Sequence, residues 1–134
     1  MATTQQFNNY AVEFLNKMIQ TFPTETKIQV YLLKFETLKL MNSRKPVEMF
    51  MDNMYPFGEQ IMSNNEDFFK KDEFVNNAEN ISGKIGLVDH WDSTDEKTKA
   101  SIWEYMKGLY VLGMSCLGKE AELQQLLIKI NYYK

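Results

Sequence analysis

The chain has 134 residues, a formal net charge of −3 and a pI near 5.2, and 44% of its residues are hydrophobic. That length and apolar content predict one folded domain over residues 1–134 rather than a disordered chain. The acidic balance argues against an electrostatic nucleic-acid binder, which usually needs a basic domain. Because no run of about 18 apolar residues occurs, we expect no membrane-spanning helix.

Residue types that usually carry chemistry are scarce. The chain has one histidine (His90), one cysteine (Cys116) and one arginine (Arg44). Most catalytic and metal-binding sites need several such side chains converging on one point. A single cysteine excludes an internal disulfide, which suits a reducing compartment. We therefore predict no catalytic residues, no metal site and no cofactor, and expect a protein that acts by binding.

Apolar residues in the first half recur every three or four positions, the pattern of amphipathic helices. Pro23 should end the first helix, and Thr24 is expected to cap the second. Asn42-Ser43 supplies a turn, Pro46 suits the first turn of a third helix, and Pro56 should kink or interrupt it. The three apolar stripes are Phe7, Tyr10, Ala11, Phe14, Leu15, Met18, Ile19 and Phe22; Ile28, Tyr31, Leu32, Phe35, Leu38 and Met41; and Val47, Phe50, Met51 and Met54, with Phe57 and Ile61 beyond Pro56.

Residues 63–94 form a less regular segment in which we expect only short helices. Asn64 or Asn65 is placed to cap one of them, and Ser82-Gly83 and Gly86 interrupt any long helix.

A strong helix start follows this segment. Ser93 or Thr94 offers a hydroxyl cap, and Asp95-Glu96 places two carboxylates at the positive end of the helix dipole. Gly118 is expected to end this helix. Its apolar residues are Ile102, Trp103, Tyr105, Met106, Leu109, Tyr110 and Leu112, and a last helix carries Leu123, Leu126, Leu127 and Ile130.

Strand signals are absent, since no sustained alternation and no Asn-Gly or Asp-Gly hairpin occurs. The sequence predicts an all-α fold, a compact single-domain bundle of about five to seven helices. We expect six residues from different stripes to share its core: Phe14, Ile19, Phe35, Phe50, Ile102 and Leu109.

The only chemical candidates have simpler interpretations. His90 lies in the acidic segment Asp89–Glu96, but no second histidine or cysteine is near it in sequence and the spacing is not that of a calcium loop. We interpret the segment as a polar loop before a helix. Cys116 lies in the apolar stretch 112–117, where a buried cysteine behaves as a small hydrophobic residue.

Aromatic residues are a better indication of function. Phe68 and Phe69 adjoin in an otherwise polar stretch, and neighbours on a helix point about 100° apart, so one stripe cannot easily bury both. One ring is then core and the other an exposed anchor, or both lie beneath the neighbouring loop. Similar logic applies to Trp103 beside Ile102. The candidate partner-binding residues are Phe68, Phe69, Phe74 and Trp103.

Three stretches carry a resemblance to a known set of proteins. Phe14-Leu15 with Ile19 and Phe22-Pro23, residues 61–69, and Lys99 to Leu109 resemble small uncharacterised helical proteins of nucleocytoplasmic large DNA viruses of algae and protists. The resemblance spans most of the chain but consists of apolar helix faces and one aromatic pair. It implies a viral protein of the host cytoplasm or the virion, and it supplies no enzyme activity.

Two functions follow as hypotheses. The first is a non-enzymatic interaction protein, a virion component or adaptor that binds a viral or host protein and is itself a monomer or weak homodimer. The alternative is an accessory nucleic-acid-binding factor in viral replication or transcription that stacks aromatic rings on bases, although nucleic acid is not the expected partner.

Overall fold

Every regular element in the described part of the computed structural model is helical. The structure describes residues 3–66 and 84–131, and no strand occurs in that part of the chain. The all-α prediction is therefore confirmed, and the six α-helices of the described residues fall within the predicted number. The elements are α1 (Thr4–Thr21), α2 (Thr26–Met41), α3 (Lys45–Asp52), η1 (Tyr55–Phe57), α4 (Gly58–Met62), η4 (Leu87–Asp89), η5 (Trp91–Ser93), α6 (Glu96–Cys116) and α7 (Glu120–Lys129).

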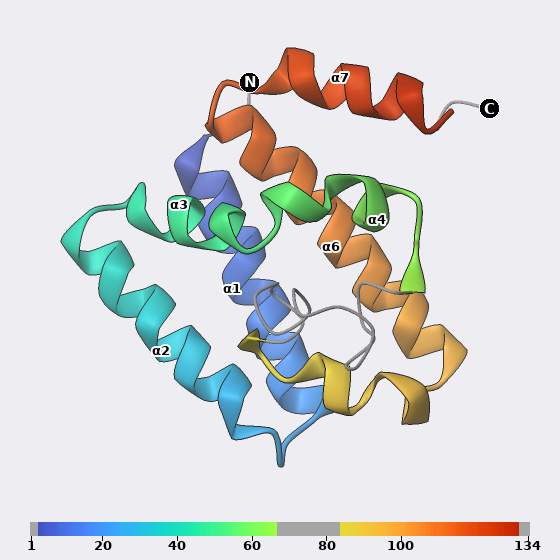
Figure 1. The fold of residues 1–134 in the computed structure, drawn as a ribbon. Helices are drawn as coiled ribbons and strands as arrows, with labels where there is room; N and C mark the ends of the chain where they lie inside the picture. Colours follow the sequence, from blue (N-terminus) through green and yellow to red (C-terminus); the bar gives the residue numbers. More distant parts are fainter. Residues whose placement is uncertain (1–2, 67–83, 132–134) are drawn as a thin grey trace.

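The helices are arranged around the contact between α1 and α6, the two longest (Figure 1). α2 packs against α1 along one edge of the molecule, and α3 bridges α2, α1 and α6. α4 and α7 pack on α6. The short helices η4 and η5 lie near the turn between α1 and α2 (Figure 1).

One hydrophobic core joins these helices. Phe14, Phe35, Phe50, Ile102 and Leu109 are fully buried in it, as predicted. Ile19 is only half-buried and packs against the core from its border. The ring of Phe50 makes edge contacts with three others, at centroid distances of 5.6 Å to Phe7, 5.9 Å to Tyr31 and 6.4 Å to Phe35. This aromatic cluster holds α3 against α1 and α2.

The two predicted hydroxyl caps are wrong, because carboxylates take both positions. Glu25 caps α2 in place of Thr24, and its Oε2 accepts a hydrogen bond from the Lys27 amide at 3.3 Å. Asp95 caps α6, and its Oδ1 accepts from the Thr98 amide at 2.7 Å. That bond lowers the pKa of the Asp95 carboxyl.

The expected interruptions and ends are confirmed. Pro46 lies in the first turn of α3, and Pro56 interrupts the chain as part of the short helix η1. Gly118 follows α6 with a φ of +72°, a conformation that glycine adopts without strain, and the Lys119 amide closes the helix end on the Met114 carbonyl at 2.8 Å.

The irregular segment predicted over 63–94 is described only at its two ends. Residues 63–66 and 84–94 contain turns and 3-10 helices, as expected, and Gly86 has a φ of +78°. Ser82-Gly83 lies outside the described residues.

Candidate partner-binding surface

The structure does not support Trp103 as an exposed anchor. Its side chain is only 7% exposed, and its ring packs edge-on against Trp91 with centroids 5.7 Å apart. α6 is covered by α1 on one side and by α4 and α7 on others, so both Ile102 and its neighbour Trp103 are buried. Of the two alternatives for this pair, the structure shows the one in which both side chains are buried. Phe68, Phe69 and Phe74 lie outside the described residues.

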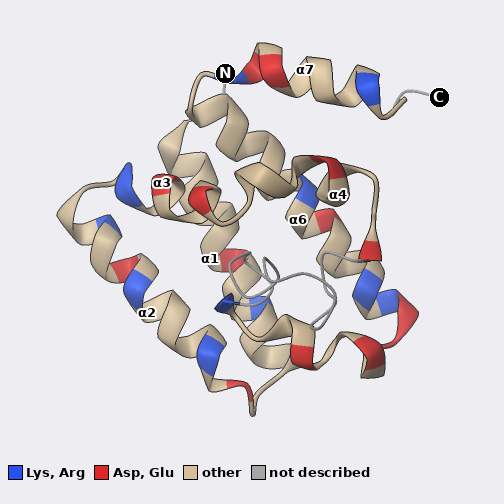
Figure 2. Ribbon diagram, viewed as in Figure 1, with Lys and Arg blue, Asp and Glu red and all other residues tan. Residues whose placement is uncertain are grey.

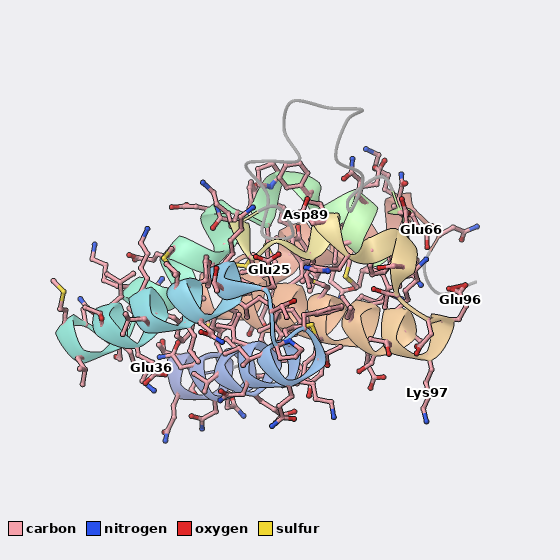
Figure 3. All side chains as sticks on the ribbon, turned by 90° about the horizontal axis from the view of Figure 1, so that it is seen from below. Glu25, Glu36, Glu66, Asp89, Glu96 and Lys97 are labelled. Atoms are coloured by element: carbon pink, nitrogen blue, oxygen red, sulfur yellow. The ribbon has the colours of Figure 1, made fainter. Side chains whose placement is uncertain are left out.

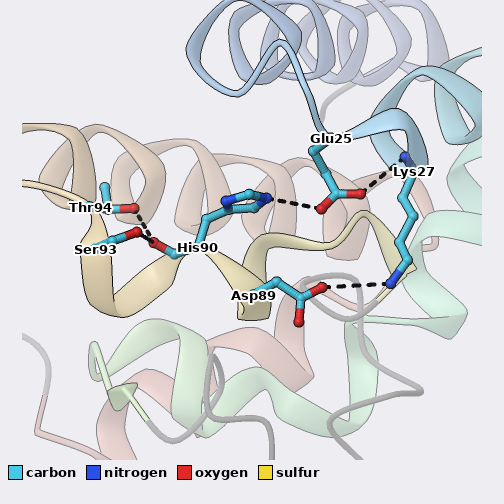
Figure 4. A network of polar contacts seen from close by, with 6 residues as sticks. All are labelled: Glu25, Lys27, Asp89, His90, Ser93 and Thr94. Atoms are coloured by element: carbon cyan, nitrogen blue, oxygen red, sulfur yellow. Dashed lines mark hydrogen bonds and ion pairs between the residues drawn. The ribbon is translucent and has the colours of Figure 1, made fainter.

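His90 belongs to a polar network between the start of α2 and the segment before α6 (Figure 4). Its Nε2 lies 2.9 Å from Oε1 of Glu25, and its ring stacks on Phe22 at a centroid distance of 5.0 Å. The hydroxyls of Ser93 and Thr94 donate to the His90 carbonyl at 3.0 and 2.7 Å. Sequence reasoning missed Glu25 as the partner, because 65 positions separate the two residues.

The same network joins the backbone of segment 84–89 to α2. Gly86 has a φ of +78°, which favours glycine, and a Cβ there would lie 2.5 Å from Cδ of Glu25, so a side chain would force the Glu25 carboxylate to move. Nζ of Lys27 lies 3.7 Å from Oδ2 of Asp89. Glu25 thus caps α2, binds His90 and packs on Gly86. We call Glu25, Lys27, Asp89 and His90 the polar latch.

Cys116 has a structural role at the other end of the molecule. Its thiol donates to the Thr3 carbonyl with Sγ 3.3 Å from the oxygen, and Nη1 of Arg44 donates to the Cys116 carbonyl at 3.2 Å. Partial burial raises the pKa of the thiol, and the nearby Arg44 charge opposes that rise only in part. A protonated thiol is a poor nucleophile.

The outer side of α2 carries an unusual set of exposed apolar residues. Val30 is 66% exposed, Leu33 69%, Leu40 88% and Met41 76%. Only three other large hydrophobic residues in the described chain are exposed, and they are scattered over η1, α6 and α7. Figure 1 shows α2 at the edge of the molecule, where none of the other described helices covers its outer side.

These residues form one continuous line, which we call the outer stripe: Val30, Leu33, Thr37, Leu40 and Met41. At about 100° per residue it lies roughly opposite the buried residues Ile28, Tyr31 and Phe35. The Thr37 hydroxyl donates to the Leu33 carbonyl at 2.9 Å, so it needs no outside partner. The first four residues are spaced three, four and three apart, which is the a and d spacing of a helix-pairing seam.

A pocket of about 390 Å³ adjoins the Val30 end of the outer stripe, between α2 and α3. We call it the α2–α3 pocket. The buried Tyr31 contributes to its lining and donates its hydroxyl to Oδ1 of Asn53 at 3.4 Å. Burial and the nearby Asp52 carboxylate raise the Tyr31 pKa, so the phenol stays neutral. The lining residues are Thr26, Lys27, Val30, Tyr31, Lys34, Met49, Asp52, Asn53 and Lys84.

The pocket is basic on balance. Three lysines (Lys27, Lys34 and Lys84) line it against one carboxylate, Asp52. Lys27 is paired with Asp89, but Lys34 and Lys84 have no ionic partner in the described part of the chain. Charged residues of both signs occur along α2 (Figure 2), so their positions around the helix decide the balance.

The opposite flank of the stripe differs. Glu36 lies on the side of α2 away from α3 (Figure 3) and is paired with Lys39 at 3.3 Å. The outer stripe therefore has an uncompensated basic flank on its α3 side only.

The sequence did contain a signal for this surface. Residues 28–41 are apolar at two interleaved sets of positions, and only the inner set, with Met41, was assigned to a stripe. A helix that is apolar on two sides needs cover on both. A single-stripe interpretation of α2 gives Val30, Leu33 and Leu40 no role, because they lie on the second face.

No other class of site emerges from residues 3–66 and 84–131. That part of the chain holds no group of three or more His, Cys, Asp or Glu side chains that could bind a metal ion. None of its helices combines the length and the apolar character needed to cross a bilayer.

None of the protein-family models, curated proteins and solved structures compared with this chain matches it.

Proposed function

We propose that this chain is a non-enzymatic binding module that holds another protein on the outer side of α2. The observation that carries the proposal is the outer stripe, with Leu33 and Leu40 mostly in contact with water. Burying a leucine side chain contributes roughly 1.5 to 3 kcal/mol, so an exposed line of such residues favours association. Contiguous exposed apolar surface on a folded protein marks interaction sites more often than scattered residues do.

The fold itself does not need this apolar surface. α2 is already held by Ile28, Tyr31 and Phe35 on its inner side. Polar residues at positions 30, 33 and 40 would leave the core intact. Their apolar character is therefore better explained by a partner than by folding.

The biological setting is part of the same proposal. We infer an adaptor or virion protein of a large DNA virus, present in host cytoplasm or in the particle. This rests on the resemblance of residues 14–23, 61–69 and 99–109. The nucleic-acid alternative is retained only because lysines gather at the α2–α3 pocket, although the chain as a whole is acidic.

The proposal is tested by affinity purification from cells that naturally make the protein, followed by mass spectrometry. Wild type is compared with Leu33→Glu and with Asn16→Glu, which adds the same charge on the exposed polar side of α1. We expect a protein recovered with wild type and Asn16→Glu but lost with Leu33→Glu. Equal recovery with all three would contradict a role for the outer stripe.

A salt titration separates the two kinds of partner. Binding that depends on phosphate contacts weakens steeply as salt rises, because counterions are released. An apolar seam keeps most of its affinity. Retention of the partner in high salt supports protein binding, whereas loss of all bound material together with nucleic acid favours the alternative.

A further inference from the structure

We propose that the partner segment is an amphipathic α-helix with acidic residues along one flank and one bulky apolar anchor. This inference rests on the proposed function and specifies its partner. It combines three features on one side of the molecule: the outer stripe, the α2–α3 pocket, and Lys34 and Lys84, which have no ionic partner among residues 3–66 and 84–131.

The spacing of the outer stripe favours a helical partner segment. Val30, Leu33, Thr37 and Leu40 are spaced three, four and three residues apart, as in the seven-residue repeat of paired helices, so a partner helix can keep contact with them over three turns. A peptide that binds by strand addition needs an exposed sheet edge, and the described residues contain no strand. The stripe is about 16 Å long at 1.5 Å per residue, which matches a partner of three to four turns.

The positive charges of the α2–α3 pocket favour acidic residues on one flank of the partner helix. Lys34 follows Leu33 on the α3 side of the outer stripe, and both Lys34 and Lys84 line the α2–α3 pocket. Carboxylates on the facing side of a partner helix would pair with both lysines. Asp52 also lines the pocket, so the acids should be aimed at Lys34 and Lys84 rather than spread along the flank.

A second copy of this chain does not satisfy the same positions. In an antiparallel pair of α2 helices the flank that carries Lys27 and Lys34 faces itself, which brings like charges together. In a parallel pair Lys34 faces Gln29, which carries no charge. Neither arrangement neutralises the lysines, so charge complementarity favours a different, acidic chain.

The α2–α3 pocket favours a partner with one large apolar side chain that acts as an anchor. Its volume of about 390 Å³ lies within the usual range for a bound organic group and accommodates one large side chain. Met49 and Val30 supply apolar contacts, and the Tyr31–Asn53 hydrogen bond lies in the lining. An aromatic or leucine side chain beside the seam would fill it, in the manner of interface hot spots.

Three labelled synthetic helical peptides test the inference by fluorescence anisotropy. They share leucines at seam spacing and one tryptophan anchor, and differ only on one flank, which carries glutamates, lysines or glutamines. Protein variants are Lys34→Glu with Lys84→Glu, and a control of equal charge change, Lys17→Glu with Lys97→Glu, at exposed lysines elsewhere. Circular dichroism establishes that each variant is folded.

We expect wild type and the control variant to bind the glutamate peptide at least tenfold more tightly than the lysine peptide. The Lys34→Glu, Lys84→Glu variant should invert that preference, and Leu33→Glu should abolish binding of all three. Equal binding of the three peptides would overturn the charge inference while leaving the proposed function intact. Binding that survives Leu33→Glu would place the peptides elsewhere and contradict both.

Other results would assign the outer stripe to a different kind of partner. If none of the peptides binds but capture of a protein still depends on Leu33, the partner is not an amphipathic helix and this inference fails. A wild-type dimer in analytical ultracentrifugation that dissociates in Leu33→Glu would assign the surface to a second copy. Displacement of the glutamate peptide by duplex DNA would assign it to nucleic acid. Each of these results overturns an acidic helical partner.

Discussion

α1 and α2 are neighbouring helices of similar length, 18 and 16 residues, and both are held by aromatic residues of the same core. Their outer sides differ completely. The exposed residues of α1 are all polar: Gln5, Gln6, Asn9, Glu13, Asn16, Lys17, Gln20 and Thr21. The exposed residues of α2 include Val30, Leu33, Leu40 and Met41.

The difference separates what the fold requires from what it does not. α1 is an ordinary amphipathic helix, with one face buried and one face in water. α2 carries the same kind of buried face and a second apolar face that no described element covers. The exposed side of α1 shows that a helix of this bundle can face water with polar residues alone. The apolar outer stripe of α2 therefore needs an explanation other than folding.

The largest expected effect contrasts the two faces of α2. Phe35→Ala removes a fully buried ring and should lower the free energy of unfolding by about 3 to 5 kcal/mol. Leu33→Ala, two positions away, should change it by less than about 0.5 kcal/mol, as exposed substitutions do. Urea denaturation followed by circular dichroism measures both. A comparable loss in the two variants would mean that Leu33 is covered in solution.

For partner binding, we expect the exposed residues of α2 to have the large effect. Leu33→Ala and Leu40→Ala should each weaken the complex by on the order of 2 kcal/mol, the scale of an interface hot spot. The matched change on α1, Asn16→Ala, should leave the dissociation constant unaltered. Calorimetric titration with the purified partner measures these values, and a stronger effect of Asn16→Ala would exchange the roles of the two helices.

The polar latch should have a smaller effect, on stability alone. Glu25→Gln weakens both the α2 cap and the contact with His90, and we expect a loss of about 1 kcal/mol. Combining it with His90→Gln should add little, because both changes remove the same contact. Fully additive losses in this double-mutant cycle would indicate that the two side chains do not interact.

The smallest effect concerns the link between α1 and α6 at high pH. The Tyr105 hydroxyl donates to Oε2 of Glu13 at 2.8 Å, and burial together with this carboxylate raises the Tyr105 pKa to about 12. A raised pKa contributes stability below the unfolded value of 10.0 that is lost as the pH rises through about 12. Unfolding free energies of wild type should fall more steeply over that window than those of Tyr105→Phe. Parallel curves would exclude this contribution.

Much of the fold could be predicted from local patterns. Helix positions, the turn at Asn42-Ser43 and the effects of Pro56 and Gly118 follow from apolar spacing and from the backbone limits of proline and glycine. The caps were mistaken because Thr24 and Glu25, or Thr94 and Asp95, are adjacent candidates. Only the backbone path decides which of two neighbours reaches the first amides.

The candidate site was harder to predict for two physical reasons. A helix that packs on one side only cannot easily bury both Ile102 and Trp103, but α6 is covered on several sides and buries both. The α2–α3 pocket depends on residues distant in sequence, since Lys34 and Lys84 both line it although 50 positions separate them. Pairings of that kind leave no local pattern.

The outer stripe is tested most directly by placing a photoreactive phenylalanine analogue at position 33 of α2 or at position 16 of α1, and irradiating the protein in cells that make it. We expect a discrete crosslinked protein from position 33, absent from position 16 and competed by excess unlabelled wild type but not by Leu40→Glu. Crosslinks of equal yield at both positions, or none at position 33, would contradict the assignment of the outer side of α2 as the binding surface.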